Sequence, residues 1–345
     1  MTTANNAKIV VTKDQVTKDS VANVLIKSTA RLHMGFFDLH GGLGRKFGSI
    51  GLSLATPSIE ISAEVSDNLL VEGVESAIDK VSIIAQQFIT KLNIDGSVRL
   101  NIRQHIPEHA GLGSGTQSAL VVGTAISQLY HLNLRTAKIA ALTGRGGRSG
   151  IGIAAFDYGG LLVDGGRASE VSASASKLIS SKVPPLLARY DFPEDWRVLL
   201  ILDANQPGIH GEVEREAFNK LPVFSENLAA HLCRHVLMQA MPALVEHDLT
   251  AFGFAIQELQ SHVGDYFAPA QGGRYASQQV GAVLQALQNM GVACFGQSSW
   301  GPTGFAVFEN EVEAEKHLQQ LETMFLDSHL IWKICSARNS GAEFV

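Results

Sequence analysis

The sequence predicts an α+β protein of two domains, and three observations carry this prediction. The chain has 345 residues, which is more than one hydrophobic core usually organises. An alternating strand, a glycine-rich turn and an apolar helical segment follow one another over residues 97–130. After residue 191, the order of expected strands and helices suits a small antiparallel sheet with helices on one side.

The expected domains are a flexible tail over residues 1–20, an N-terminal α/β domain over 21–190 and a C-terminal α+β domain over 191–345. The tail is polar and repeats Thr-Lys-Asp, while Pro184, Pro185 and Pro193 indicate the junction between the two domains. In the first domain we expect strands at 24–27, 50–61, 97–104 and 161–164, and helices at 77–92 and 118–130. In the second we expect strands at 197–202, 292–295, 304–308 and 330–335, helices up to about 290, and a helix at 312–325.

Composition excludes several classes of protein. The net charge is −6 and no lysine or arginine run offsets it, so nucleic acid is not an expected partner. No run of about 18 apolar residues and no secretory leader is found, so we expect a cytoplasmic protein without a membrane span. The three cysteines, Cys233, Cys294 and Cys335, have no metal-like spacing and are expected to be reduced core residues.

The most informative motif is the run from Pro107 to Gln117, which contains three glycines within five residues and leads into the apolar segment. Glycine lets the backbone turn sharply and approach a ligand, and a helix start offers unpaired N–H groups to an anion. The spacing matches neither a Walker loop nor a dinucleotide-binding fingerprint. The alternative is a purely structural turn. The candidate phosphate-binding residues are Gly111, Leu112, Gly113, Ser114, Gly115 and Thr116.

This run resembles the second motif of the GHMP kinase superfamily, Pro-x-x-x-Gly-Leu-Gly-Ser-Ser, with Gly115 in place of the second serine. Two further stretches are more specific: 28–51, which contains Arg-Leu-His at 31–33, and 144–166, which contains Arg-Ser-Gly-Ile-Gly at 148–152. Together they resemble the beta-ribofuranosylaminobenzene 5'-phosphate synthases, members of that superfamily that are not kinases. The resemblance extends from about Val24 to the C-terminus.

The resemblance implies a GHMP-kinase-like fold with a ferredoxin-like C-terminal domain. It also implies condensation of 5-phosphoribosyl 1-diphosphate with 4-aminobenzoate or 4-hydroxybenzoate, releasing CO2 and diphosphate, in tetrahydromethanopterin biosynthesis. Mg2+ is the expected metal because it neutralises diphosphate, and no organic cofactor is expected. An ATP-dependent sugar-type kinase of the same superfamily is the alternative function, and a ligand-binding module without activity is a third.

Several polar residues near these motifs are candidates for the chemistry. Planar guanidinium groups grip phosphate or carboxylate in two places, so the candidate substrate-binding residues are Arg31, Arg45, Arg145 and Arg148, together with Ser149. Trp300 either stacks on the aromatic acid or packs in the core. The catalytic candidates are Asp157, its rival Asp38, and His33 as an acid, each with a purely structural alternative. The metal ligands are unknown.

Two features of the region 221–259 leave alternatives open. His231 and His235 lie one helical turn apart, but two ligands do not make a metal site. The helices from Leu221 to Leu259 could offer a homodimer surface, yet the same residues would serve as core.

Overall fold

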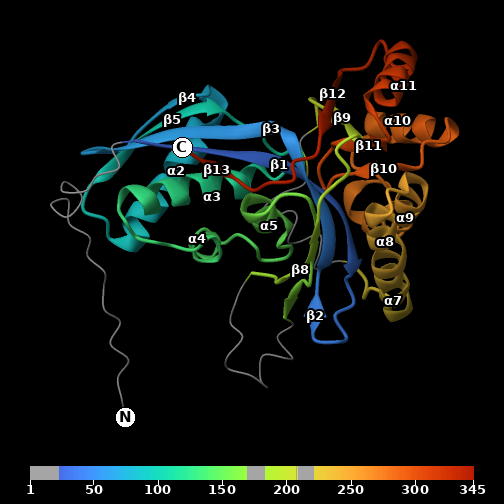
Figure 1. Cartoon of the computed structure of the whole chain (residues 1–345), viewed down its shortest axis with the longest axis horizontal. Coiled ribbons are helices and arrows are strands. Elements are labelled where there is room, and N and C mark those ends of the chain that lie inside the picture. Colours follow the sequence, from blue (N-terminus) through green and yellow to red (C-terminus); the bar gives the residue numbers. More distant parts are fainter. Residues whose placement is uncertain (1–22, 169–182, 207, 209–220) are drawn as a thin grey trace.

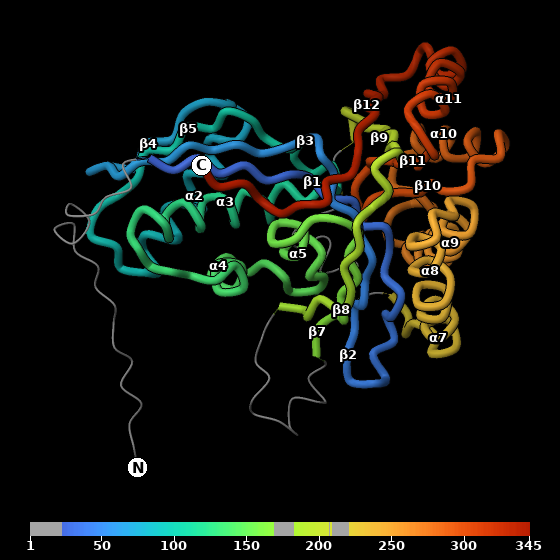
Figure 2. Tube along the Cα trace, in the orientation of Figure 1, coloured from blue at the N-terminus to red at the C-terminus, as the bar shows by residue number. Residues whose placement is uncertain are grey.

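The computed structural model describes residues 23–168, 183–206, 208 and 221–345 (Figures 1 and 2). The tail expected over residues 1–20 lies outside this range. Two sheets, each with its helices, lie side by side (Figure 1). The long strands β1 (Val24–Asp38) and β3 (Gly48–Ser66) belong to the first sheet and extend toward the second. Among the described residues no helix is both long and apolar enough to cross a membrane.

The first sheet has seven strands and carries helices on one face. Its main path is β13-β1-β3-β5-β4, and β6 joins the sheet through β3 and pairs in turn with β8. The other strands are β4 (Leu70–Gly73), β5 (Ser97–Gln104), β6 (Leu161–Asp164), β8 (Leu186–Tyr190) and β13 (Glu343–Phe344). Helices α2 (Glu75–Leu92), α3 (Ser114–Leu129), α4 (Thr136–Leu142) and α5 (Ile151–Asp157) lie below it in Figure 1. Because α3 is apolar nearly all round, it is buried between the sheet and its neighbours.

The second sheet is antiparallel with the order β10-β11-β9-β12. Its strands are β9 (Arg197–Asp203), β10 (Cys294–Gln297), β11 (Gly304–Phe308) and β12 (Leu330–Ser336). The helices are α7 (Glu226–His235), a π-helical turn (Val236–Ala240), α8 (Met241–Val245), α9 (Leu249–Gln271), α10 (Gln278–Asn289) and α11 (Glu311–Met324). If the four strands are numbered 1 to 4 in chain order, they read 2-3-1-4 across the sheet, which is the ferredoxin-like arrangement.

Most expected elements are confirmed, and the differences have physical reasons. The strands at 97–104 and 161–164 coincide with β5 and β6, but β1 and β3 are much longer than expected. The glycines around residues 48–51 fit strand pairing rather than a loop, since a Cβ at Gly51 would lie 2.5 Å from the carbonyl oxygen of Leu32. The apolar segment at 118–130 belongs to helix α3, which begins at Ser114, directly after Gly113, at the helix start that the glycine loop predicts.

The end of the chain returns to the first sheet, where Phe344 pairs with Ile26. No motif indicated this return, and the domain boundary at 190/191 stays a prediction.

In the region 221–259, Leu232, Phe252 and Ile256 are buried in the core, whereas Leu237 and Met238 are exposed. The homodimer also stays a prediction. All three cysteines are free thiols, and Cys294 and Cys335 are buried as expected.

Candidate active site

Three segments that are distant in sequence meet at the edge of β1. Register shifts between Thr29 and Arg31 and between His33 and Gly35 mark bulges, which re-aim side chains next to functional sites. Arg31 Nη1 donates to the carbonyl oxygen of Gly111 at 2.5 Å, and Ser298 Oγ donates to the same oxygen at 2.9 Å. The N–H of His33 donates to Ser298 Oγ, and the N–H of Ser299 donates to the carbonyl of His33. The glycine loop, β1 and the loop after β10 are thus tied together.

The glycine loop forms the N-terminus of α3. Gly113 has φ of 84°, a left-handed conformation that favours glycine, and its carbonyl accepts the N–H groups of Thr116 and Gln117. The first helical N–H groups, those of Ser114 and Gly115, have no helical partner and belong to residues that line a cleft. Donors at a helix start favour an anionic ligand.

Two joined cavities surround this junction. The loop cleft, of about 400 Å3, is lined by the glycine loop together with Lys80 and His109. The arginine cleft, of about 580 Å3, is lined by Arg31, His33, Phe36, Phe47, Arg145, Arg148, Ser149, Arg167 and Trp300. Arg31, Thr116, Arg145, Ser299 and Trp300 line both. None of the described residues that line either cleft is acidic, so the walls favour anions strongly.

Arg145 stands between the two clefts. Its Nε is buried and has no hydrogen-bond partner among the described residues, and burial lowers the pKa of this guanidinium. A Cβ at Gly115 would have its nearest neighbour in Arg145 Nη1, at 3.1 Å. A longer side chain at position 115 would therefore press on the guanidinium. The glycine that replaces the second serine of the superfamily motif leaves room for Arg145 above the helix start.

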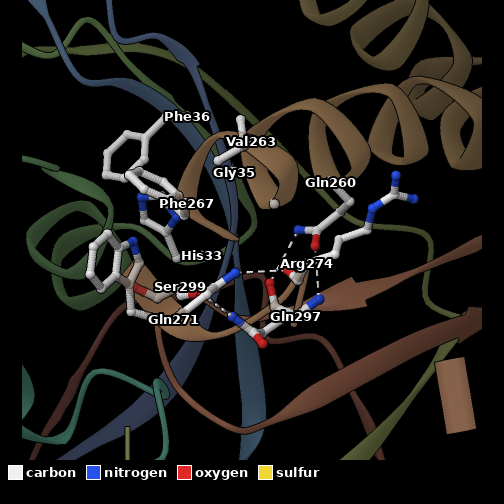
Figure 3. Close-up of a pocket in the computed structure, with 12 residues that line it drawn as sticks. His33, Gly35, Phe36, Gln260, Val263, Phe267, Gln271, Arg274, Gln297 and Ser299 are labelled. Carbon is white, nitrogen blue, oxygen red and sulfur yellow. Dashed lines mark hydrogen bonds between the residues drawn. The ribbon is translucent and has the colours of Figure 1, made fainter. Parts of the chain in front are cut away.

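The arginine cleft has an aromatic wall formed by Phe36, Phe47 and Trp300. His33 is buried against this wall, with its ring centroid 4.5 Å from that of Phe36 (Figure 3). Burial, reinforced by the charge of Arg31, lowers the pKa of His33 to about 3. The imidazole is therefore neutral near pH 7, so the premise of the expected acid role, an ordinary histidine pKa, does not hold. Its Nε2 has no hydrogen-bond partner among the described residues.

A buried glutamine pair holds this wall in place. Gln260 on α9 donates to the carbonyl oxygens of Met34 and Gln297, and its own amide oxygen accepts the N–H of Gln297 (Figure 3). These bonds join β1 to the start of the loop that carries Trp300. The Trp300 ring is 3% exposed and packs on Phe267 with centroids 4.7 Å apart, while its residue also lines both clefts. Both expected roles of Trp300, packing and ligand contact, are geometrically compatible.

Ser149 lies in the arginine cleft and is supported from behind by Asp164. The Asp164 carboxylate accepts hydrogen bonds from Ser49, Ser149 and the N–H groups of Gly150 and Gly166 at 2.6–3.0 Å. Burial raises the pKa of Asp164 even though these donors lower it. Asp164 thus shapes the segment that carries Arg148 and Ser149 without lining the cleft itself.

Three expected site residues lie elsewhere among the described residues. Arg45 donates to the carbonyl oxygens of Gly165 and Gly166, where β2 (Arg45–Lys46) pairs with β7 (Arg167–Ala168). Asp38 accepts the N–H groups of His40 and Gly41, which is the turn-capping alternative. Asp157 is exposed at the C-terminal end of α5, about 9 Å along the helix from the end at the cleft. None of the three lines either cleft.

Sequence reasoning missed several lining residues. Lys80 on α2 reaches the loop cleft and pairs with Glu108 at 2.9 Å. Arg167 follows the Asp-Gly-Gly motif at 164–166 and lies 5.4 Å from the centre of the Phe47 ring. The position of Arg167 beside that motif could have indicated it, whereas Lys80 lies on an ordinary helix face. Phe36 and Phe47 both follow the Arg-Leu-His stretch, and neither was among the expected site residues.

Comparison with known proteins agrees with this geometry. The GHMP kinases N terminal domain family matches residues 76–160, and the GHMP kinases C terminal family matches residues 240–326. Homoserine kinase from Cytophaga hutchinsonii has the same fold, with a TM-score of 0.65 and 16% identity over 95% of this chain and 99% of that one. The two family matches and the fold thus define a protein of the GHMP kinase superfamily.

Two relatives identify the family within this superfamily. The chain is 35% identical over 323 residues to the beta-ribofuranosylphenol 5'-phosphate synthase of Archaeoglobus fulgidus, covering 92% of this chain and 98% of that one. It is 36% identical over 314 residues to the enzyme of the same name from Methanocaldococcus jannaschii, covering 85% and 92%. The chain therefore belongs to the beta-ribofuranosylphenol 5'-phosphate synthase family, and the resemblance inferred from the motifs is confirmed.

Proposed function

We propose that the protein condenses 5-phosphoribosyl 1-diphosphate with 4-hydroxybenzoate, releases diphosphate and CO2, and forms a ribosylphenol 5'-phosphate for tetrahydromethanopterin biosynthesis. The observation that carries this proposal is the pair of joined clefts, rich in arginine and aromatic side chains and without an acidic residue among the described lining. The sequence left 4-aminobenzoate and 4-hydroxybenzoate open. The relatives are named for a phenol product, which derives from the hydroxy acid.

The loop cleft suits the leaving diphosphate. Lys80, the N–H groups at the start of α3, and the two arginines shared with the second cleft surround this space with donors and positive charge. When the bond between ribose C1 and the diphosphate oxygen breaks, the oxygen keeps the electron pair and C1 gains oxocarbenium character. Cations already in place stabilise the growing negative charge without reorganisation.

The arginine cleft suits the aromatic acid and the 5-phosphate. Phe36, Phe47 and Trp300 offer apolar walls for the ring, and Arg148 and Arg167 offer donors for a carboxylate or a phosphate. The ring carbon that bears the carboxylate forms the new bond to C1. The bond to the carboxylate then breaks, its electron pair restores the aromatic ring, and CO2 leaves.

This reaction needs no base, because CO2 leaves where a proton otherwise would. A neutral His33 and the absence of acidic groups among the described lining residues are compatible with it. A kinase would instead need a group that positions or deprotonates the attacking hydroxyl. Asp157, the sequence candidate for that role, lies at the far end of α5.

Mg2+ stays a prediction, and the described residues that line the clefts offer no carboxylate ligand for it. Protein carboxylates are the ligands through which Mg2+ usually binds, and the described lining of the two clefts has none. We therefore assign Mg2+ to the substrate, on its phosphate oxygens, and assign no step of the reaction to it.

The test is release of labelled CO2 from carboxyl-labelled 4-hydroxybenzoate by the purified protein with Mg2+ and phosphoribosyl diphosphate. Parallel tubes contain labelled 4-aminobenzoate, or ATP in place of phosphoribosyl diphosphate. Release that requires phosphoribosyl diphosphate, faster with the hydroxy acid, is expected. A folded protein that releases no CO2 but consumes ATP would instead establish the kinase alternative.

A pair of arginine variants connects the activity to the arginine cleft. Arg148→Ala should raise KM for phosphoribosyl diphosphate or for the acid by about 10- to 150-fold, since a charge-assisted contact contributes about 1.5–3 kcal/mol. Arg103→Ala is the matched control, because Arg103 is an exposed arginine on β5 that pairs with Glu60. Equal kinetics of the two variants would remove Arg148 from the site.

A further inference from the structure

Four side chains converge between α7 and α9, and none of them lines either cleft. His231 and His235 belong to α7, and Glu258 and His262 belong to α9. Each pair is separated by four residues, so its members lie on one face of their helix. The two faces oppose each other, which the sequence could not show because only the pair on α7 was recognisable.

The distances within this cluster suit one metal ion. His231 Nε2 lies 2.8 Å from Glu258 Oε2, His262 Nε2 lies 3.6 Å from it, and His235 Nε2 lies 4.0 Å from it. The ligand atoms of His231, Glu258 and His262 all lie within 4.8 Å of one another. Ligands of a tetrahedral zinc ion, each about 2.0–2.1 Å from the metal, lie about 3.3 Å apart. The three distances to the carboxylate bracket this value.

The His235 ring is also oriented for a metal. Gln239 Oε1 lies 2.7 Å from His235 Nδ1 and can only accept a hydrogen bond, so Nδ1 carries the proton and Nε2 has the free electron pair. A partner on the second ring nitrogen is characteristic of histidine ligands.

We propose that His231, Glu258 and His262, with His235 as a fourth ligand, bind one transition-metal dication of the Zn2+ class. Imidazole nitrogen with one carboxylate is a donor set that suits zinc and its neighbours, whereas Mg2+ and Ca2+ prefer oxygen ligands. The side chains are only partly buried, with exposed fractions of 19–43%, so an ion can enter from solvent. This site is independent of the synthase reaction.

The bound ion ties α7 to α9. Helix α9 also carries Gln260, whose side chain holds Met34 of β1 and the loop that leads to Trp300. The ion therefore stabilises the helix pair that supports the wall of the arginine cleft. Its expected effect is structural, an increase in thermal stability.

The test uses the full-length, untagged protein after removal of metal with a chelator. Equilibrium dialysis against ZnCl2 with excess MgCl2, followed by metal analysis, should give about one Zn2+ per chain. His262→Ala and His231→Ala should each weaken Zn2+ binding by more than about 10-fold. A loss of about 10-fold is typical when the changed residue only hydrogen-bonds to a metal ligand. Zn2+ should raise the melting temperature of the parent protein and not of these variants.

Two matched controls identify the ligands. His317→Ala removes a histidine that pairs with a single carboxylate, Glu313, at the same i, i+4 spacing, and it should keep Zn2+ binding. Cys233→Ser removes the thiol between the two α7 histidines, whose Sγ contacts the carbonyl of Phe37 instead, and should also keep it. Zn2+ binding equal in the parent protein and in His231→Ala and His262→Ala variants with a native circular dichroism spectrum would overturn the proposal. So would loss of binding in Cys233→Ser.

Discussion

Replacing Arg145 with methionine should separate ligand binding from stability. The Arg145 guanidinium has a buried Nε without a hydrogen-bond partner among the described residues, and burial disfavours its charge. Such a group is costly in the free protein and useful only when an anion lies beside it. Methionine keeps most of the apolar stem and removes the charge.

The two effects have opposite signs and comparable size. A buried polar group without a partner costs about 1–3 kcal/mol, so the ligand-free Arg145→Met protein should equal the parent protein in unfolding free energy or exceed it by about 1 kcal/mol. Loss of a charge-assisted hydrogen bond to the substrate should cost about 1.5–3 kcal/mol of binding, a factor of about 10–150 in Kd. The variant is therefore expected to be at least as stable and much less active.

Urea unfolding without ligand measures the first quantity, and calorimetric titration with inorganic diphosphate measures the second. Arg103→Met serves as the control, because Arg103 is exposed on β5 away from the clefts and should change neither quantity by more than about 0.5 kcal/mol. An Arg145→Met protein that binds diphosphate normally but unfolds more easily would show that Arg145 is a structural residue.

Three further changes test other parts of the site. Gly111→Ala should weaken diphosphate binding and lower stability by more than about 2 kcal/mol in urea unfolding, because at φ of 78° its Cβ would lie 2.3 Å from the Ser298 carbonyl oxygen. The pKa of His33 is about 3 in the folded protein against about 6.5 unfolded, so the unfolded chain binds the extra proton between these values and stability falls with decreasing pH. The parent should thus lose about 2 kcal/mol more than His33→Asn between pH 7 and pH 5 in urea unfolding, and equal losses would contradict this. Asp157→Asn should leave kcat and KM within about 2-fold in the CO2 assay, since the side chain is exposed; a large fall in kcat would return it to the site.

The fold was predictable because its signals are local and periodic. The alternation over residues 97–104 and the apolar run after the glycine loop predict β5 and α3 with little error. The extent of β1 and β3 was not predictable, because their glycines resemble loop residues until the partner strand is known. The return of Phe344 to β1 depends on a pairing across the whole chain, which no local pattern encodes.

The site was predictable only where a motif carried it. The candidates Arg31, Arg145, Arg148 and Ser149 line the clefts, and so do the glycine-loop candidates except Leu112, whose side chain is buried in the core. Asp157 and Arg45 lie near motifs in sequence but have partners outside the clefts, namely Thr136 for Asp157 and the carbonyls of Gly165 and Gly166 for Arg45. Proximity to a motif does not determine the direction of a side chain. Lys80 comes from a helix without any motif, and only the packing of α2 beside the loop reveals it.

The departure of Gly115 from the superfamily motif can be understood as part of a change in chemistry on a conserved scaffold. Phosphoryl transfer needs a group to position the attacking hydroxyl and metal ions held near the transferred phosphate. Loss of diphosphate from a sugar carbon instead needs cations at the leaving group and a wall that excludes water from the developing cation. Glycine at position 115 admits the guanidinium of Arg145 over the same helix start, and Phe36, Phe47 and Trp300 form the apolar wall next to it. On this reasoning the glycine loop keeps its place at the helix start, and the proposed role of Arg145, between the two clefts, is to stabilise the leaving diphosphate in a reaction that needs no base.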